Sequence, residues 1–150
     1  KYLRVAAVPT THLITLTVTE KGYCRDSANG QLDASHPDTV HDLAEPDHPR
    51  SAPDLLLASL RRRREQATAA PTIVCCDNTP ENGRAVRRVL LELSALVDIP
   101  LANWIEQAVR FPCTMEDRIV PATTPADTAA AHAVLGLHDA ALVATEPFSQ

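Results

Sequence analysis

The chain has 150 residues, of which 45% are hydrophobic, 22% are charged and 3% are aromatic. This balance predicts one globular domain of ordinary size and excludes an intrinsically disordered chain. The formal net charge of −5 argues against a broad nucleic-acid-binding surface. No apolar run approaches the roughly 18–20 residues of a membrane span. We therefore expect neither nucleic acid nor a membrane as a partner.

Four cysteines are spread along the chain without a CxxC pair. Cys75 and Cys76 are neighbours on a predicted strand, so their side chains point to opposite faces, which is a poor arrangement for joint metal binding. With Cys24 and Cys113, we interpret them as reduced thiols of a cytoplasmic protein. The opening KYLRVAAVPT lacks the pattern of a signal peptide.

The first predicted strand covers residues 12–20, where apolar residues alternate with threonines. It ends in a polar turn, in which we expect Gly22 to need a positive φ. Residues 24–36 are polar and rich in turn formers, and the pair Asn29 and Gly30 predicts a tight turn there.

A short helix is predicted over residues 37–43. His36, His41 and Asp42 lie near it, which makes a metal site one interpretation. Because no further ligand cluster converges in the sequence, we instead interpret the histidines as surface residues.

A longer helix is predicted from an N-cap at Ser51 to about Thr68, with Pro53 and Asp54 in its first turn. The four arginines at 61–64 point around most of a helix circumference, so they cannot form one face for nucleic acid. We interpret them as a solvated helix end, where positive charge is favourable near the C-terminal dipole.

The stretch TIVCCDNTPENG, residues 72–83, joins a short apolar run to polar residues and turn signals. The run at 73–76 predicts a strand buried on both faces. Asp77 and Asn78 follow at its carboxyl end, where open α/β sheets bind their ligands. The alternative is that both residues only cap the following helix.

The rest of the chain continues the alternation of helices and strands, which predicts parallel βαβ units. Residues 110–121 have no clean period, and their charged residues indicate either a buried salt bridge or a site. We interpret Trp104 as a core anchor. The predicted elements are helices over 83–97 and 101–109, a helix from an N-cap at Thr124 to Leu135, and a strand over 141–144.

Three blocks, in this order, resemble the long-chain mannitol dehydrogenase family: TVTEKGY at 17–23, CDNTPENG at 76–83 and FPCTMEDRIVP at 111–121. That family includes mannitol 2-dehydrogenase, fructuronate reductase and tagaturonate reductase. The resemblance implies an α/β fold with a partial Rossmann-like parallel sheet flanked by helices, as a single domain over 1–150. It also implies NAD-dependent interconversion of a polyol or sugar acid with its keto sugar, of the mannitol/fructose or mannonate/fructuronate type.

The resemblance implies roles for four residues and no metal in the site. Asn78 would donate a hydrogen bond to the reacting oxygen, because hydride addition to a ketone builds alkoxide charge that an amide donor stabilises. Asp117 would hold the substrate or position the catalytic lysine, and Thr19 and Glu20 would lie beside the cofactor. Glu116 departs from the family pattern, which has valine at this position.

The family's Gly-rich phosphate turn and ribose-binding acidic residue are expected before Lys1, and its catalytic lysine and helical C-terminal domain after Gln150. We therefore expect the chain to be a fragment that is inactive by itself. The particular sugar, NADP in place of NAD and the oligomeric state stay open. Two other functions also stay open, namely a non-catalytic α/β scaffold or interaction module, and a metal-dependent hydrolase using Asp77.

Overall fold

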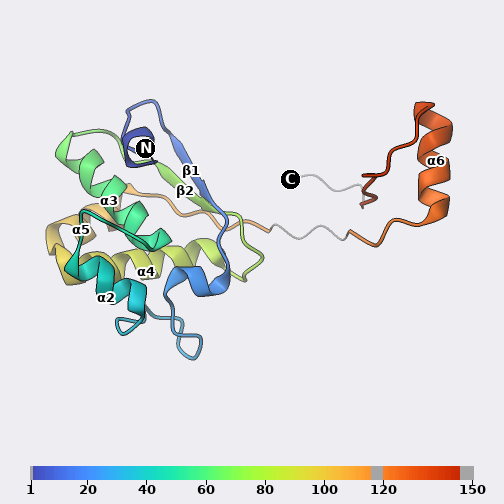
Figure 1. Cartoon of the computed structure of the whole chain (residues 1–150). Helices are drawn as coiled ribbons and strands as arrows, with labels where there is room; N and C mark the ends of the chain where they lie inside the picture. Colours follow the sequence, from blue (N-terminus) through green and yellow to red (C-terminus); the bar gives the residue numbers. More distant parts are fainter. Residues whose placement is uncertain (1, 116–119, 146–150) are drawn as a thin grey trace. The chain divides into compact units, whose positions relative to one another are not determined.

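Residues 2–115 and 120–145 are described by a computed structural model, and they fall into two compact units (Figure 1). The first unit, within Lys1–Met115, contains the sheet and the hydrophobic core. The second, within Glu116–Gln150, contains the helix α6. Across both described ranges, no helix has the length and apolar character needed to cross a membrane.

A parallel pair of strands, β1 (Leu13–Leu16) and β2 (Thr72–Cys75), forms the centre of the first unit. The register joins the two strands along their full length, so both carboxyl ends lie at the same edge. Thr72 also forms a parallel bridge with Arg110, which brings the segment after the last helix of this unit beside β2. The predicted parallel sheet is confirmed.

The strand β1 is shorter than the sequence predicts, because the chain after Leu16 turns to polar contacts. The backbone N–H of Val18 donates to the carboxylate of Asp77 at 2.9 Å instead of to a neighbouring strand. Residues Glu20–Tyr23 then form a short 3-10 helix, η1. The end of β1 is thus tied to the end of β2 by a side chain.

The loop after η1 contains the tight turn expected at Asn29 and Gly30, and Gly30 has a φ of +72°. The expectation of a positive φ at Gly22 is wrong, since Gly22 lies inside a right-handed 3-10 turn. Cys24 adopts the left-handed conformation instead, with a φ of 52°.

Helices pack on the sheet and on one another, and polar side chains begin several of them (Figure 1). Ser51 accepts a hydrogen bond from the backbone of Asp54, and Asp98 accepts one from the backbone of Leu101. The predicted helices of this unit are confirmed, whereas α1 was not predicted. The helices are α1 (Tyr2–Ala6), α2 (Pro37–Ala44), α3 (Ala52–Glu65), α4 (Asn82–Val97) and α5 (Ile99–Ala108).

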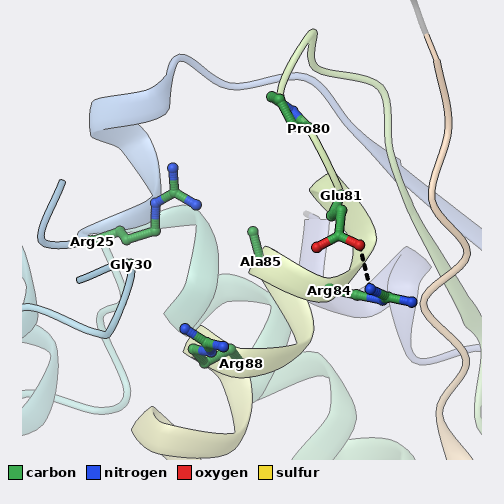
Figure 2. Close-up of a pocket in the computed structure, with 7 residues that line it drawn as sticks. All are labelled: Arg25, Gly30, Pro80, Glu81, Arg84, Ala85 and Arg88. Carbon is green, nitrogen blue, oxygen red and sulfur yellow. Dashed lines mark hydrogen bonds and ion pairs between the residues drawn. The ribbon is translucent and has the colours of Figure 1, made fainter. Parts of the chain in front are cut away.

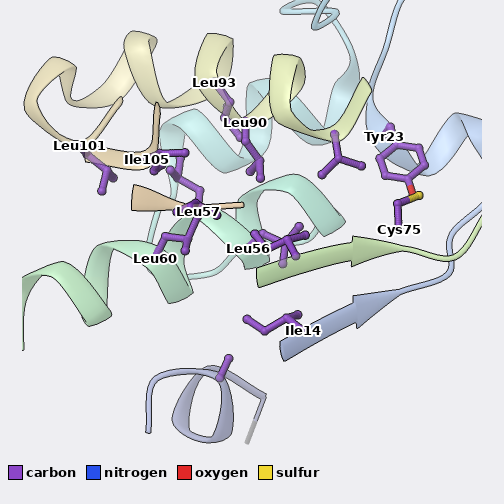
Figure 3. Packing of buried hydrophobic residues seen from close by; sticks show 14 residues of the cluster. Ile14, Tyr23, Leu56, Leu57, Leu60, Cys75, Leu90, Leu93, Leu101 and Ile105 are labelled. Atoms are coloured by element: carbon purple, nitrogen blue, oxygen red, sulfur yellow. The ribbon is translucent and has the colours of Figure 1, made fainter. Parts of the chain in front are cut away.

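The core lies between the strands and the apolar faces of α3, α4 and α5 (Figure 3). In the apolar run 73–76, Ile73 and Cys75 are buried, while Val74 and Cys76 are half-buried. Only one face of the strand is therefore fully buried, although the sequence predicts full burial of both faces. Trp104 is partly buried against the core, as expected for an anchor. Further buried members are Ile14, Leu57, Leu60, Leu90, Leu93, Leu101 and Ile105.

The prediction of a solvated end for the arginine run is wrong at Arg63, which is 1% exposed. Its guanidinium donates to the carbonyl of Ala6 at 2.7 Å, to that of Val8 at 3.0 Å and, twice, to that of Ala69. Burial lowers the pKa of Arg63 from its ordinary value. Arg63 therefore joins α1, α3 and the approach to β2 through the hydrogen bonds to these carbonyls.

In the second unit, Thr124 and Asp127 form a capping box at the start of α6 (Pro125–Leu135), as predicted. The strand predicted over 141–144 is absent from the described structure. The carbonyl of Leu142 accepts a hydrogen bond from the Thr123 hydroxyl at 2.8 Å, and no strand of this unit's described residues lies beside it. An isolated strand has no backbone partners and is not stable.

Candidate active site at the carboxyl edge of the sheet

The first two sequence blocks and the described start of the third, residues 111–115, meet at the edge where β1 and β2 end. The contact between Val18 and Asp77 joins the first block to the second. Asn82 joins the second block to the third, since its side-chain amide donates to the Thr114 hydroxyl at 2.9 Å and its oxygen accepts the Thr114 backbone N–H at 3.0 Å. Segments distant in sequence thus form one edge, which is where ligands bind in open α/β sheets.

Asp77 is held by donors from three directions. Besides the N–H of Val18, its carboxylate accepts the phenolic hydrogen of Tyr23 and contacts the Cys75 sulfur at 3.2 Å. Burial, together with the hydrogen bond to Asp77, raises the pKa of Tyr23 far above its ordinary value, so this phenol stays protonated. The Tyr23 hydroxyl and the Cys75 sulfur are 2.8 Å apart (Figure 3). Asp77 is therefore structural.

Asn82 is a second anchor, although the sequence indicates only a turn at this residue. It is 1% exposed, and its amide also donates to the carbonyls of Cys75 and Asp77, at 3.1 and 2.9 Å. A Cβ on the next residue, Gly83, would lie 2.4 Å from the carbonyl oxygen of Pro112. A polar residue followed by glycine at the first turn of an amphipathic helix is the signal that could have identified this close packing.

Asn78 occupies the exposed position between these anchors. Its amide makes no hydrogen bond to the described residues, and the neighbouring N–H of Thr79 bonds back to the carbonyl of Asp77 at 2.8 Å. The alternative that Asp77 and Asn78 cap the next helix is wrong, because the N-cap of α4 is Glu81, in the left-handed conformation with a φ of 51°. The Asn78 amide is thus available to a ligand.

The other predicted site residues are placed in part. Thr19 is exposed and precedes η1, but its side chain makes no capping hydrogen bond. Glu20 begins η1, and its side chain lies outside the described structure. Asp117 and Glu116 also lie outside the described residues. The described edge therefore brings Thr19 and Asn78 to the ends of neighbouring strands.

A separate cavity of about 280 Å³ lies beside the loop that leads into α4 (Figure 2). Arg84, which forms an ion pair with Glu81, lines it together with Arg25 and Arg88. Neither Thr19 nor Asn78 lines this cavity, so it is distinct from the exposed edge.

Residues 3–150 match the family model described as "Mannitol dehydrogenase Rossmann domain". The D-mannonate oxidoreductase of Escherichia coli K12 is 47% identical over 148 residues, which are 99% of this chain and 30% of that protein. The mannitol 2-dehydrogenase of Cereibacter sphaeroides is 43% identical over 142 residues, 95% of this chain and 29% of that protein.

A solved structure of Pseudomonas fluorescens mannitol 2-dehydrogenase, a ternary complex with NAD and D-mannitol, superposes with a TM-score of 0.77 at 39% identity. The match covers 98% of this chain and 30% of that one. The expected Rossmann-like fold is confirmed, and the chain spans about 30% of the length of these relatives. By the match over nearly all of its residues, the chain belongs to the mannitol dehydrogenase family and matches that family's Rossmann domain.

Proposed function

We propose that the protein containing this chain is an NAD-dependent oxidoreductase that interconverts a polyol or sugar acid with its keto sugar. Family membership and relatives named for mannonate and mannitol support this class of reaction. The observation that carries the proposal is the amide of Asn78, which is exposed, makes no hydrogen bond to the described residues and follows β2 on a loop anchored by Asp77. The chain supplies this part of the site to a longer protein.

The chemistry of the described edge fits part of a dinucleotide. Thr19 and Asn78 offer neutral hydroxyl and amide groups, which suit ribose hydroxyls and a carboxamide. The carboxylate of Asp77 accepts hydrogen bonds from a backbone N–H and from Tyr23. These donors stabilise its negative charge before an anionic dinucleotide approaches. NAD, or NADP as the alternative, would lie against Thr19 and Asn78, with Glu20 as a further contact.

The reduced cofactor, when bound, supplies the hydride for the substrate carbonyl. As the carbonyl carbon becomes tetrahedral, negative charge develops on its oxygen, and the amide N–H of Asn78 donates to that oxygen. A donor held in place by its loop stabilises this charge without reorganisation. Asp117 is proposed to bind a sugar hydroxyl or to position the catalytic lysine that the family resemblance implies.

The geometry of Asp77 argues against the hydrolase alternative. A nucleophilic or metal-binding carboxylate needs an accessible oxygen, whereas both oxygens of Asp77 face donors within the protein. The four cysteines are free thiols, two of them buried, and we propose a reducing, cytoplasmic location for the protein.

The proposed reaction is tested on the full-length protein by following NADH absorbance. Fructose and fructuronate serve as oxidised substrates, and mannitol and mannonate as the reduced substrates for the reverse direction. Turnover with one of these pairs supports the proposal. Absence of turnover with all four, in a folded protein, contradicts it and favours the non-catalytic scaffold.

A further inference from the structure

Three side chains with metal-binding atoms converge away from the sheet edge. The sulfur of Cys24, a ring nitrogen of His36 and a carboxylate oxygen of Asp38 all lie within 4.8 Å of one another. Cys24 follows η1, and the other two residues begin α2. The set combines sulfur, nitrogen and oxygen, which is a donor combination that zinc accepts.

Backbone hydrogen bonds hold this arrangement in place. The N–H of Asp33 donates to the carbonyl of Cys24 at 2.8 Å, and the N–H of His36 donates to the carbonyl of Asp33 at 3.1 Å. Asp38 donates its own N–H to Nδ1 of His36 at 3.2 Å. The loop therefore presents the three side chains together before any ligand arrives.

Cys24 is the buried member of this set. It is 2% exposed, whereas His36 and Asp38 are half-buried. The Thr39 hydroxyl is itself buried and has no hydrogen-bond partner among the described residues. A thiolate formed at Cys24 on cation binding would be an acceptor for this neighbouring hydroxyl.

We propose that Cys24, His36 and Asp38 bind a divalent cation of the zinc class, which fastens the loop to the start of α2. Two ligands on one tetrahedral zinc lie roughly 3.4–3.7 Å apart, so the atoms of this set, which lie within 4.8 Å of one another, must close by at most about 1 Å. The side chains of His36 and Asp38 are 31% and 49% exposed and can rotate to do so. Binding releases the thiol proton of Cys24 to solvent, and water takes the fourth position.

The neighbouring polar residues are already engaged and are not ligands in this proposal. Asp42 is 1% exposed. Its carboxylate accepts the N–H groups of Arg50 and Ser51 at 2.8 and 2.9 Å and contacts Nδ1 of His41 at 3.0 Å. If Nδ1 of His36 were the ligand, cation binding would break the hydrogen bond that this atom accepts from the N–H of Asp38 at the start of α2.

The test is a titration of the metal-free, full-length protein with Co²⁺, followed by competition with Zn²⁺. We expect thiolate-to-cobalt charge-transfer absorption that saturates at one equivalent and is removed by Zn²⁺. Cys24→Ser should abolish this absorption and lower the affinity by more than about 100-fold, since even outer-shell changes cost 10–100-fold. Cys113→Ser is the matched control, because this thiol is exposed and outside the cluster.

A second variant separates metal binding from folding. His36→Asn keeps a good N-cap for α2, so the metal-free protein should retain its circular dichroism spectrum while losing Co²⁺ affinity. Zn²⁺ should raise the Tm of the wild type and leave that of His36→Asn unchanged. No charge-transfer band in the wild type, a band that survives Cys24→Ser, or a band lost in Cys113→Ser would each overturn the site.

Discussion

Tyr23 donates its phenolic hydrogen to Asp77, so a side chain that follows β1 holds the carboxylate that follows β2. The same carboxylate accepts the backbone N–H of Val18. The two loops that border the proposed cofactor site are thereby fixed to each other, and Asn78 lies directly after this junction.

Tyr23→Phe removes this donor and leaves a partly buried carboxylate with fewer partners. The free energy of unfolding should fall by about 1–3 kcal/mol, as for a buried acceptor that loses its donor. Chemical denaturation of the full-length protein measures it. An unchanged free energy of unfolding would show that the phenol does not stabilise the junction.

Gly83→Ala places a Cβ about where the Pro112 carbonyl oxygen lies, at 2.4 Å. Because the obstructing atoms belong to the backbone, the segment after α5 must shift, and we expect a loss of about 1–3 kcal/mol in stability. Gly22→Ala is the comparison, since its nearest neighbour is the Val18 side chain at 3.2 Å. Equal losses in the two variants would argue against the close approach at Gly83.

Arg63→Met should destabilise the protein by about 2–5 kcal/mol, because the carbonyls of Ala6, Val8 and Ala69 lose their buried donor. Arg62→Met, one residue away and exposed, should change stability by less than about 0.5 kcal/mol. Thermal or chemical denaturation compares the two. Similar effects would restore the interpretation of the whole run as a solvated helix end.

The raised pKa of Asp54 leads us to expect that the free energy of unfolding depends on pH. Burial, with the charge of Asp42 adding to it, raises the pKa of Asp54 to about 6, above an unfolded value of about 3.9. The folded state therefore holds this proton more tightly, and the contribution to stability is lost as pH rises from about 4 to about 6.

Asp54→Asn should remove that part of the pH dependence and raise stability at pH 7 by about 1–3 kcal/mol. Denaturation between pH 4 and pH 7, with Asp47→Asn as an exposed control, measures both effects. A pH profile identical to that of the wild type would contradict the raised pKa.

The sequence was sufficient where local pattern decides the structure. The apolar run before Asp77 predicts β2, and the periodic apolar residues after Gly83 predict α4. The anchoring residues could not be predicted in this way. Arg63 and Asn82 carry polar groups whose partners come from segments distant in sequence, so their burial depends on tertiary packing that no local period encodes.

The roles of the site residues stay predictions. The family blocks identify Thr19 and Asn78, and both residues lie just after neighbouring strands, with side chains that make no hydrogen bond to the described residues. The exposure of Asn78 and the engagement of Asp77 depend on the groups that surround each residue, which the sequence alone does not specify. The prediction of a strand over 141–144 is wrong for the same reason. A strand forms only where a neighbouring strand supplies hydrogen bonds, and the local sequence does not encode that neighbour.

The proposed mechanism requires the Asn78 amide to stabilise the charge that develops on the reacting oxygen. This role is measured as kcat for hydride transfer by the full-length protein carrying Asn78→Ala, compared with Asn103→Ala on the exposed face of α5. We predict a decrease of more than tenfold, on the order of 10²–10³ if Asn78 is a full oxyanion donor, and no change for Asn103→Ala. An unchanged kcat for Asn78→Ala would show that Asn78 is not the oxyanion donor.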